Sequence, residues 1–188
     1  ILTNTIDVLQ DVDETNTKEA ESAIIMWEKD NFFPGLAWYG IIKAQNCFLN
    51  GNYDEGLEYI KDYVNTSANE VIMFPKIRLH FIRALLLYAK ETTLSTSESE
   101  TLLLDLEELN GYYKETPINF KFQNLLLKAE GMKNNSSEWD VAKHYDSALK
   151  YAKKIKNNFY ISMASLCAGR FWASMKNRDL CNYYYTEA

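Results

Sequence analysis

The chain has 188 residues, of which 47% are hydrophobic and 24% are charged, and both values are ordinary for a folded protein. Its 3 prolines and 7 glycines are too few for an all-β chain, which needs a turn about every ten residues. A net charge of -6 argues against a general nucleic-acid-binding protein, because neutralising phosphates requires an excess of basic residues. The composition therefore favours helices whose interfaces are filled by 13 tyrosines, 9 phenylalanines and 4 tryptophans.

A helical reading of the hydrophobic pattern predicts an all-α protein of roughly nine helices. Residues 1–16 form an acidic lead-in, and the repeats occupy residues 17–188 as a single domain. The helices expected in chain order are 17–30, 36–49, 53–64, 76–91, 100–114, 119–132, 137–156, 158–175 and 178–188.

Several boundaries of these helices carry recognisable signals. Thr17 is the expected N-cap of the first helix, and Asn50-Gly51 is the expected C-terminal stop of the second. Either Ser136 or Ser137 is expected to cap the helix that follows it. Three segments are expected to break or restart helices, namely Phe33-Pro34-Gly35, Pro75 and Thr116-Pro117. Residues 92–99 are rich in Ser and Thr and are expected to form a mobile loop, and the helix after it would bury Leu102, Leu103, Leu106 and Leu109.

Small residues recur at a regular position in the first helix of each expected pair. These residues are Ala44, Ala84, Ala129 and Gly169, with spacings of 40, 45 and 40 residues. Twelve positions after three of them a small–aromatic–small pattern is expected to begin, at Gly56, Val141 and Cys181. Val141-x3-Tyr145-x2-Ala148 and Cys181-x3-Tyr185-x2-Ala188 fit it well, whereas Gly56-x3-Ile60-x2-Tyr63 fits it poorly. Small residues let two backbones approach closely, so the register predicts an α-solenoid of antiparallel helix pairs with a period of about 40–45 residues.

Charge is unevenly distributed along the chain. Residues 1–35 contain eight acidic side chains against two lysines, whereas residues 141–178 contain eight basic side chains against Asp146 alone. Oppositely charged ends favour head-to-tail association or contact with an acidic partner. The alternative is that these charges simply form solvated helix faces.

Residues typical of catalysis or of metal binding are not arranged in known patterns. His80 and His144 are isolated, Cys167 and Cys181 are fourteen positions apart, and no phosphate-binding glycine motif occurs. We therefore expect no enzyme activity, no metal and no cofactor. Cys47, Cys167 and Cys181 lie in apolar helical patterns, which predicts buried thiols in a reducing, cytoplasmic compartment. The sequence has no secretory signal and no apolar run of about 18 residues, so no membrane association is expected.

A binding face is expected on the first helices of the pairs, which usually line the concave side of a helical array. A concave face of mixed aromatic and ionic groups suits a peptide or protein segment. The alternative is that its aromatic residues simply pack in the interior. The candidate residues are Trp38, Gln45, Phe48, Arg78, Phe81, Gln123, Glu130 and Arg170.

Parts of the chain resemble two kinds of known repeat sequence. Residues 51–59, Gly-Asn-Tyr-Asp-Glu-Gly-Leu-Glu-Tyr, resemble the turn and second helix of a tetratricopeptide repeat. Residues 119–130, Asn-Phe-Lys-Phe-Gln-Asn-Leu-Leu-Leu-Lys-Ala-Glu, together with Leu-Cys-Ala-Gly-Arg-Phe-Trp at 166–172 and Tyr-Thr-Glu-Ala at 185–188, resemble the helical-repeat region that follows the predicted AAA-type ATPase module in large multi-module sensor kinases. The usual Gly-containing turn of that family is replaced here by Lys176-Asn177.

The resemblance implies a non-catalytic segment that binds a protein segment or another module of its own chain and relays signals between ATPase and output modules. Because the chain starts at Ile1 and stops within a helical pattern at Ala188, we expect it to be part of a larger multi-module protein. Two alternatives stay open. One is a small-ligand sensor superhelix like those of ATPase-type transcription regulators, and the other is an oligomerisation scaffold.

Overall fold

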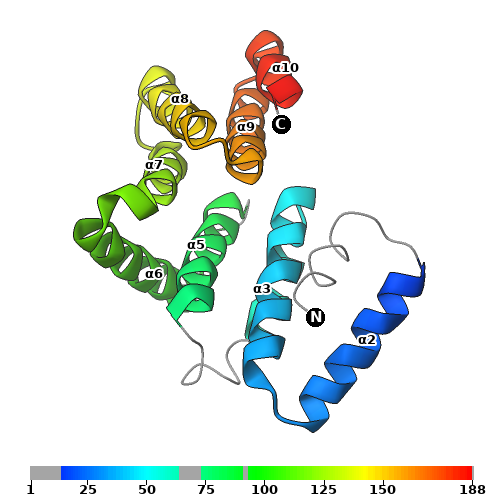
Figure 1. Cartoon of the computed structure of the whole chain (residues 1–188). Helices are drawn as coiled ribbons and strands as arrows, with labels where there is room; N and C mark the ends of the chain where they lie inside the picture. The colour runs from blue at the N-terminus through cyan, green and yellow to red at the C-terminus, as the bar shows by residue number, and fades with distance from the viewer. Residues whose placement is uncertain (1–13, 64–72, 91–92, 188) are drawn as a thin grey trace. The chain divides into compact units, whose positions relative to one another are not determined.

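A computed structural model of the chain describes residues 14–63, 73–90 and 93–187, and all of its regular structure there is helical (Figure 1). The expectation of an all-α protein is confirmed for this described part. The helices are α2 (Glu14–Lys29), α3 (Phe33–Asn50), α4 (Tyr53–Tyr63), α5 (Met73–Ala89), α6 (Thr96–Glu115), α7 (Pro117–Met132), α8 (Glu138–Lys154), α9 (Asn158–Ser174) and α10 (Arg178–Glu187). Within the described residues these nine helices agree in number with the roughly nine expected from the sequence.

The chain divides into two compact units, residues 1–82 and residues 83–188, and the division falls inside α5. In the first unit, α3 contacts both α2 and α4, and α2 and α3 run antiparallel side by side in Figure 1. The core of this unit is built on Ile41, Phe48 and Ile60, each of which is at most 2% exposed. Ala44, the register residue of this helix pair, is completely buried.

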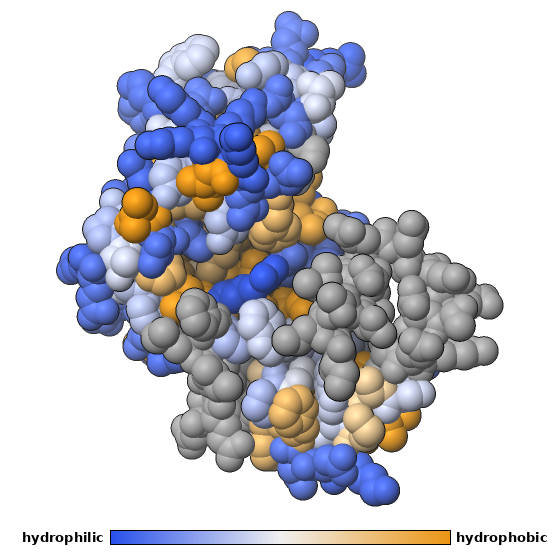
Figure 2. Space-filling view, in the orientation of Figure 1, coloured by the Kyte–Doolittle hydropathy of each residue, from blue (hydrophilic) through white to orange (hydrophobic). Residues whose placement is uncertain are grey.

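In the second unit, α6 to α10 follow one another so that each helix contacts the next. Other contacts join helices that are not consecutive. Between α7 and α9, the rings of Phe122 and Tyr160 stack with centroids 4.0 Å apart. Between α8 and α10, Tyr184 donates a hydrogen bond to Asp146. Hydrophilic residues cover most of the visible surface of α8 to α10, with separate hydrophobic residues among them (Figure 2).

The register residues of the second unit lie at tight helix contacts. Ala129 in α7 is fully buried, and on α8 the residues Val141, Tyr145 and Ala148 are at most 1% exposed. Gly169 in α9 lies directly under the ring of Tyr185 in α10, because a Cβ atom added to the glycine would be 2.4 Å from a ring carbon. The small–aromatic–small pattern therefore marks real close approaches between α7 and α8 and between α9 and α10.

Three boundary predictions need correction or refinement. Thr17 lies inside α2, so it does not cap that helix. The break before α3 falls at residues 30–32, and Pro34 sits in the first turn of the helix, where a missing N–H is tolerated. Gly51 has φ 84° and ends α3 as expected, and Ser137 caps α8 by accepting a hydrogen bond from the Asp140 amide at 3.2 Å. Residues 64–72, which join the helices expected at 53–64 and 76–91, lie outside the described residues.

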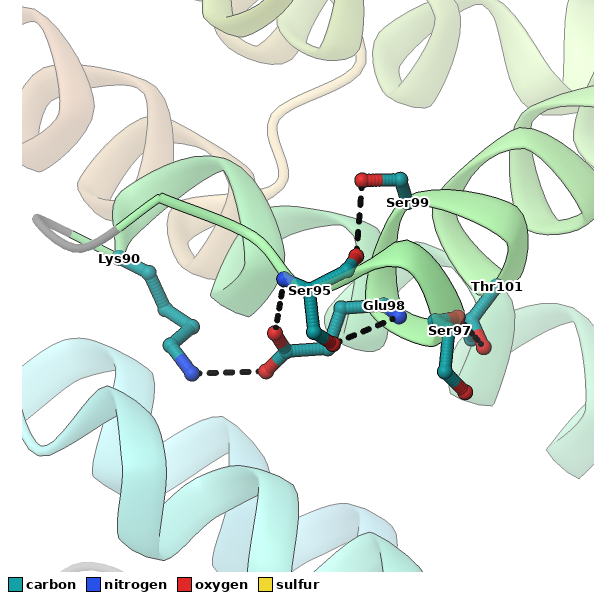
Figure 3. Close-up of polar contacts among 6 residues, drawn as sticks. All are labelled: Lys90, Ser95, Ser97, Glu98, Ser99 and Thr101. Atoms are coloured by element: carbon teal, nitrogen blue, oxygen red, sulfur yellow. Dashed lines mark hydrogen bonds and ion pairs between the residues drawn. The ribbon is translucent and has the colours of Figure 1, made fainter.

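The expected loop at residues 92–99 is wrong over its second half, because α6 begins at Thr96. Ser95 and Glu98 form a reciprocal capping box (Figure 3). The Glu98 amide donates to Ser95 Oγ at 3.2 Å, and the Ser95 amide donates to Glu98 Oε2 at 2.8 Å. Lys90 Nζ also pairs with Glu98 Oε1 at 2.7 Å. These contacts satisfy amides that a helix start otherwise leaves without partners.

The capping box makes the stability of the chain depend on pH through Glu98. The hydrogen bonds from Lys90 and Ser95 lower its pKa from the ordinary 4.5 to about 2. Since the folded-state pKa is the lower one, Glu98 stabilises the fold above about pH 4.5, and this contribution is lost as the pH falls toward 2. We expect urea denaturation between pH 2 and 7 to show a difference between the wild type and Glu98→Gln that vanishes near pH 2. The control is Glu100→Gln on the exposed face of the same helix; an equal pH dependence in both variants would contradict this account.

Three non-glycine residues that follow helix ends adopt positive φ angles. Asn31 follows α2 with φ 53°, Lys156 follows α8 with φ 55°, and Lys176 follows α9 with φ 58°. The two lysines precede Asn157 and Asn177, whose side chains accept hydrogen bonds from the first turn of the next helix. Lysine in this left-handed region is strained because its Cβ approaches a carbonyl oxygen, whereas glycine is not.

We expect Lys176→Gly to raise the free energy of unfolding by up to about 1 kcal/mol, because the strain of a left-handed lysine disappears. Lys154→Gly is the matched control, since Lys154 is an exposed lysine inside the last turn of α8. That substitution should lower the free energy by about 0.5–1 kcal/mol. Thermal and urea denaturation measure both. If Lys176→Gly destabilised the chain as much as Lys154→Gly, the strain would not exist.

Candidate protein-interaction groove

A cavity of about 530 Å³ lies between α6 and α7 in the second unit, with Tyr88 of α5 at its edge. We call it the α6–α7 groove. Its walls combine apolar side chains with amides and one charge of each sign. The lining residues are Tyr88, Leu106, Glu107, Leu109, Asn110, Phe120, Gln123, Asn124, Leu127, Lys128, Gly131 and Met132.

The two main walls come from one stripe of each helix. On α6 the groove residues Leu106 and Asn110 are four positions apart, and on α7 the residues Phe120, Asn124 and Lys128 repeat at the same interval. Residues four apart lie one above the other on a helix, so each stripe presents a continuous surface. The α6 stripe continues beyond the cavity to Leu103, which is 66% exposed. Leu103 was expected on the buried side, and that expectation is wrong.

Leu103 faces solvent because a charged residue, Asp105, occupies the buried side of α6. Asp105 is completely buried and accepts hydrogen bonds from Arg83 of α5, Nε to Oδ2 at 2.8 Å and Nη2 to Oδ1 at 2.6 Å. This fork-like pair turns Asp105 toward α5 and directs Leu103 to solvent. The alignment of α6 against the groove is therefore set by an ion pair as well as by its leucines.

Gln123 connects the groove to the helices behind it. Its side chain is 8% exposed, and its Nε2 donates to the Tyr160 hydroxyl of α9 at 3.0 Å. Its Oε1 is buried without a hydrogen-bond partner, which is uncommon for a buried polar atom. The hydrogen bond to Tyr160 of α9 thus holds the amide nitrogen in place, while the amide oxygen accepts no hydrogen bond.

Tyr88 lies against Gly131 in the lining of the groove. A Cβ atom on Gly131 would lie 2.8 Å from the Tyr88 hydroxyl, so a larger residue there would displace the ring. Burial raises the pKa of Tyr88, and the nearby carboxylate of Glu130 raises it further. The hydroxyl is therefore neutral at physiological pH and can act as donor or acceptor at the edge of the groove.

The residues expected on a concave face lie in several environments. Gln123 lines the groove, and Trp38 and Arg170 are half-buried. Phe48 and Phe81 are 1% and 4% exposed, which matches the alternative that the aromatic residues pack in the interior. In the first unit, Gln45 accepts a hydrogen bond from Arg78 Nε at 3.1 Å. That these residues form one binding face stays a prediction.

Glu130, another expected face residue, is 4% exposed and serves as an internal acceptor. It accepts a hydrogen bond from Tyr145 of α8 at 2.7 Å and pairs with Lys133. Burial is the main cause that raises the pKa of Cys167 well above its usual value, and the nearby carboxylate of Glu130 raises it further. The thiol therefore stays protonated and unreactive at neutral pH. The cluster joins α7, α8 and α9 and offers no reactive nucleophile.

The sequence-based prediction missed Asn110, Asn124, Lys128 and Asp105. The sequence does contain a signal for two of them, Asn124 and Lys128, which lie four positions apart on either side of three leucines. Such spacing marks a polar stripe at the border of a buried helix face. The position of Asp105 among four leucines offered no comparable signal, because a lone carboxylate in an apolar run is usually exposed.

Among the residues that the structure describes, no helix is long and apolar enough to cross a membrane. The same residues contain no group of three or more His, Cys, Asp or Glu side chains placed to hold a metal ion. Comparison with protein-family models, with curated proteins and with solved structures gave no match to this chain.

Proposed function

We propose that this chain is a non-catalytic, tetratricopeptide-like helical-repeat segment that binds a protein segment in the α6–α7 groove. The observation that carries the proposal is the groove itself, an apolar cavity of about 530 Å³ bordered by amide side chains. Backbone groups of an extended segment need donors and acceptors, and Asn and Gln side chains supply both. An apolar side chain of the partner would occupy the space between Leu106, Phe120 and Leu127.

The repeat part of the proposal is that α7–α8 and α9–α10 are successive units of a solenoid. Its support is the equivalent placement of Ala129 and Gly169, forty residues apart, at the close contacts of the two pairs. The links Phe122–Tyr160 and Asp146–Tyr184 join first helix to first helix and second helix to second helix. Such nearest-neighbour contacts are the basis of solenoid stability.

The relay part of the proposal rests on the resemblance of residues 119–188 to the repeats between ATPase and output modules in multi-module sensor kinases. In that setting the segment bound in the groove belongs either to another module of the same parent chain or to a second protein. Binding would depend on the state of the ATPase, because a partner that favours one state shifts the equilibrium toward it.

A selection from a random peptide display library, using the 188-residue chain as bait, tests the groove directly. Synthetic versions of the selected peptides are titrated calorimetrically into the wild type, Asn124→Ala and Lys128→Glu. We expect Kd to rise about tenfold or more in both variants, since a lost hydrogen bond or a reversed charge at a binding site costs about 1.4 kcal/mol or more. Lys150→Glu is the matched control, because Lys150 is an exposed lysine on α8 outside the groove. Peptides that bind all four proteins equally would contradict the proposal.

A small-ligand sensor is the second candidate, and the volume of the groove favours it, since ligand sites commonly enclose about 300–1,000 Å³. A thermal-shift screen with a metabolite library separates the two functions. A metabolite whose shift disappears in Asn124→Ala would support the sensor. Peptide binding without any such metabolite would favour the interaction segment.

A further inference from the structure

Three tyrosines from two helices meet on the surface of the first unit. Tyr39 of α3 lies edge-on to Tyr63 of α4, with centroids 5.0 Å apart and planes at 82°. It lies edge-on to Tyr59 as well, at 6.3 Å and 85°, while the rings of Tyr59 and Tyr63 are nearly parallel, at 22° and 6.3 Å. All three side chains are half-buried. We call this the tyrosine cluster; it holds ring faces in two perpendicular orientations next to solvent.

The carboxylates that act electrostatically on the tyrosine cluster come from α2 and α4. Burial, with smaller contributions from the neighbouring tyrosines and a carboxylate of α2, raises the pKa of Tyr39 to about 12. Burial also raises the pKa values of Tyr59 and Tyr63, and carboxylates of α2 and α4 raise them further. All of these carboxylates are exposed. They are Glu21, Glu28, Glu55 and Asp62.

The chain already places a cation on one of these rings. Lys43 Nζ lies over the ring of Tyr39, 5.6 Å from its centroid. The second unit repeats this contact with Lys121 over Tyr151 at 5.5 Å. Cations are attracted to the negative face of an aromatic ring, and the attraction is strengthened where the ring is partly desolvated. The chemistry of the cluster is therefore that of a surface for cations.

We propose that the tyrosine cluster binds an arginine side chain of a protein partner. Guanidinium is planar, so it can stack on a tyrosine face while its N–H groups reach toward carboxylates at the rim. The carboxylates of α2 and α4 repel an anionic group. An uncharged apolar side chain would gain no electrostatic attraction from these carboxylates. The site lies in the first unit, so it is separate from the α6–α7 groove and its test is independent of the groove.

The test is an NMR titration of the full chain with the peptide acetyl-Gly-Arg-Gly-amide, following the ring signals of the three tyrosines. The control peptide carries citrulline, which has nearly the same shape as arginine without its charge. We expect saturable shifts with the arginine peptide and at least tenfold weaker binding of the citrulline peptide. Equal binding of the two peptides, or no saturable shift of the tyrosine signals, would overturn the proposal.

Two kinds of variant localise the effect. Glu21→Gln and Glu28→Gln change only exposed side chains and should weaken binding of the arginine peptide at least threefold each. Tyr59→Leu keeps an apolar side chain but removes a ring face, and it should abolish the saturable shifts; unchanged signals from α8 to α10 would show that the second unit is intact. Unaltered affinity in all three variants would overturn the assignment.

Discussion

Replacing Arg83 with leucine is expected to lower the free energy of unfolding by about 3–5 kcal/mol, as measured by urea denaturation. The substitution leaves the carboxylate of Asp105 completely buried without the two hydrogen bonds that Arg83 donates. Removing the ion-pair partner of a buried charge is among the most costly changes in a protein interior. The double variant Arg83→Leu with Asp105→Leu should recover most of the loss, because two apolar side chains can replace the pair.

The exposed pair between Lys143 and Asp140 provides the control. Its side chains are 74% and 53% exposed, and its atoms are 3.2 Å apart. Lys143→Leu should change the free energy of unfolding far less than Arg83→Leu does, because solvent screens an exposed pair. If Arg83→Leu were as mild as this control, or if the double variant were less stable than Arg83→Leu, the buried pair would not hold α6 in place.

The second large effect is expected at Gly169. An alanine there would bring its Cβ to 2.4 and 2.5 Å from two ring carbons of Tyr185. Relieving that overlap requires α10 or its ring to move away from α9, and such overpacking costs about 1–3 kcal/mol. We therefore expect Gly169→Ala to lower the free energy of unfolding, although alanine is the better helix former.

Gly111 in α6 is the matched control, because no atom lies within 4 Å of a Cβ atom added to it. Gly111→Ala should raise the free energy of unfolding by about 0.5–1 kcal/mol through helix propensity alone. Adding Tyr185→Ala to Gly169→Ala should remove the overlap, so the effects of the two substitutions should not be additive. Stabilisation by Gly169→Ala to the same degree as by Gly111→Ala would show that the close approach does not exist.

Much of the helical architecture could be predicted from the pattern of apolar residues. The positions of Ala129, Val141, Tyr145 and Gly169 identified contacts between paired helices, because only small residues or a well-placed aromatic fit there. The start of α6 was missed although Ser95 and Glu98 have the spacing of a capping box. The polar composition of the segment suggested a loop, and the same hydroxyl groups that suggest a loop also serve as helix caps.

The groove was harder to predict than the fold. Helical periodicity shows which side of a helix is apolar, but it does not distinguish a side that packs from a side that borders a cavity. Phe48 and Phe81 are apolar residues that pack, whereas Phe120 lines the groove. The rotation of α6 depends on the pairing of Asp105 with Arg83, a contact between helices that no local pattern encodes.

Photo-crosslinking of a selected peptide tests the central claim most directly. A photoreactive phenylalanine replaces either Glu107, on the rim of the groove, or Lys143, on the exposed surface of α8. The proposal predicts that the peptide crosslinks to the protein with the probe at Glu107 and not to the one with the probe at Lys143. Equal crosslinking at both positions, or crosslinking at Lys143 alone, would contradict binding in the α6–α7 groove.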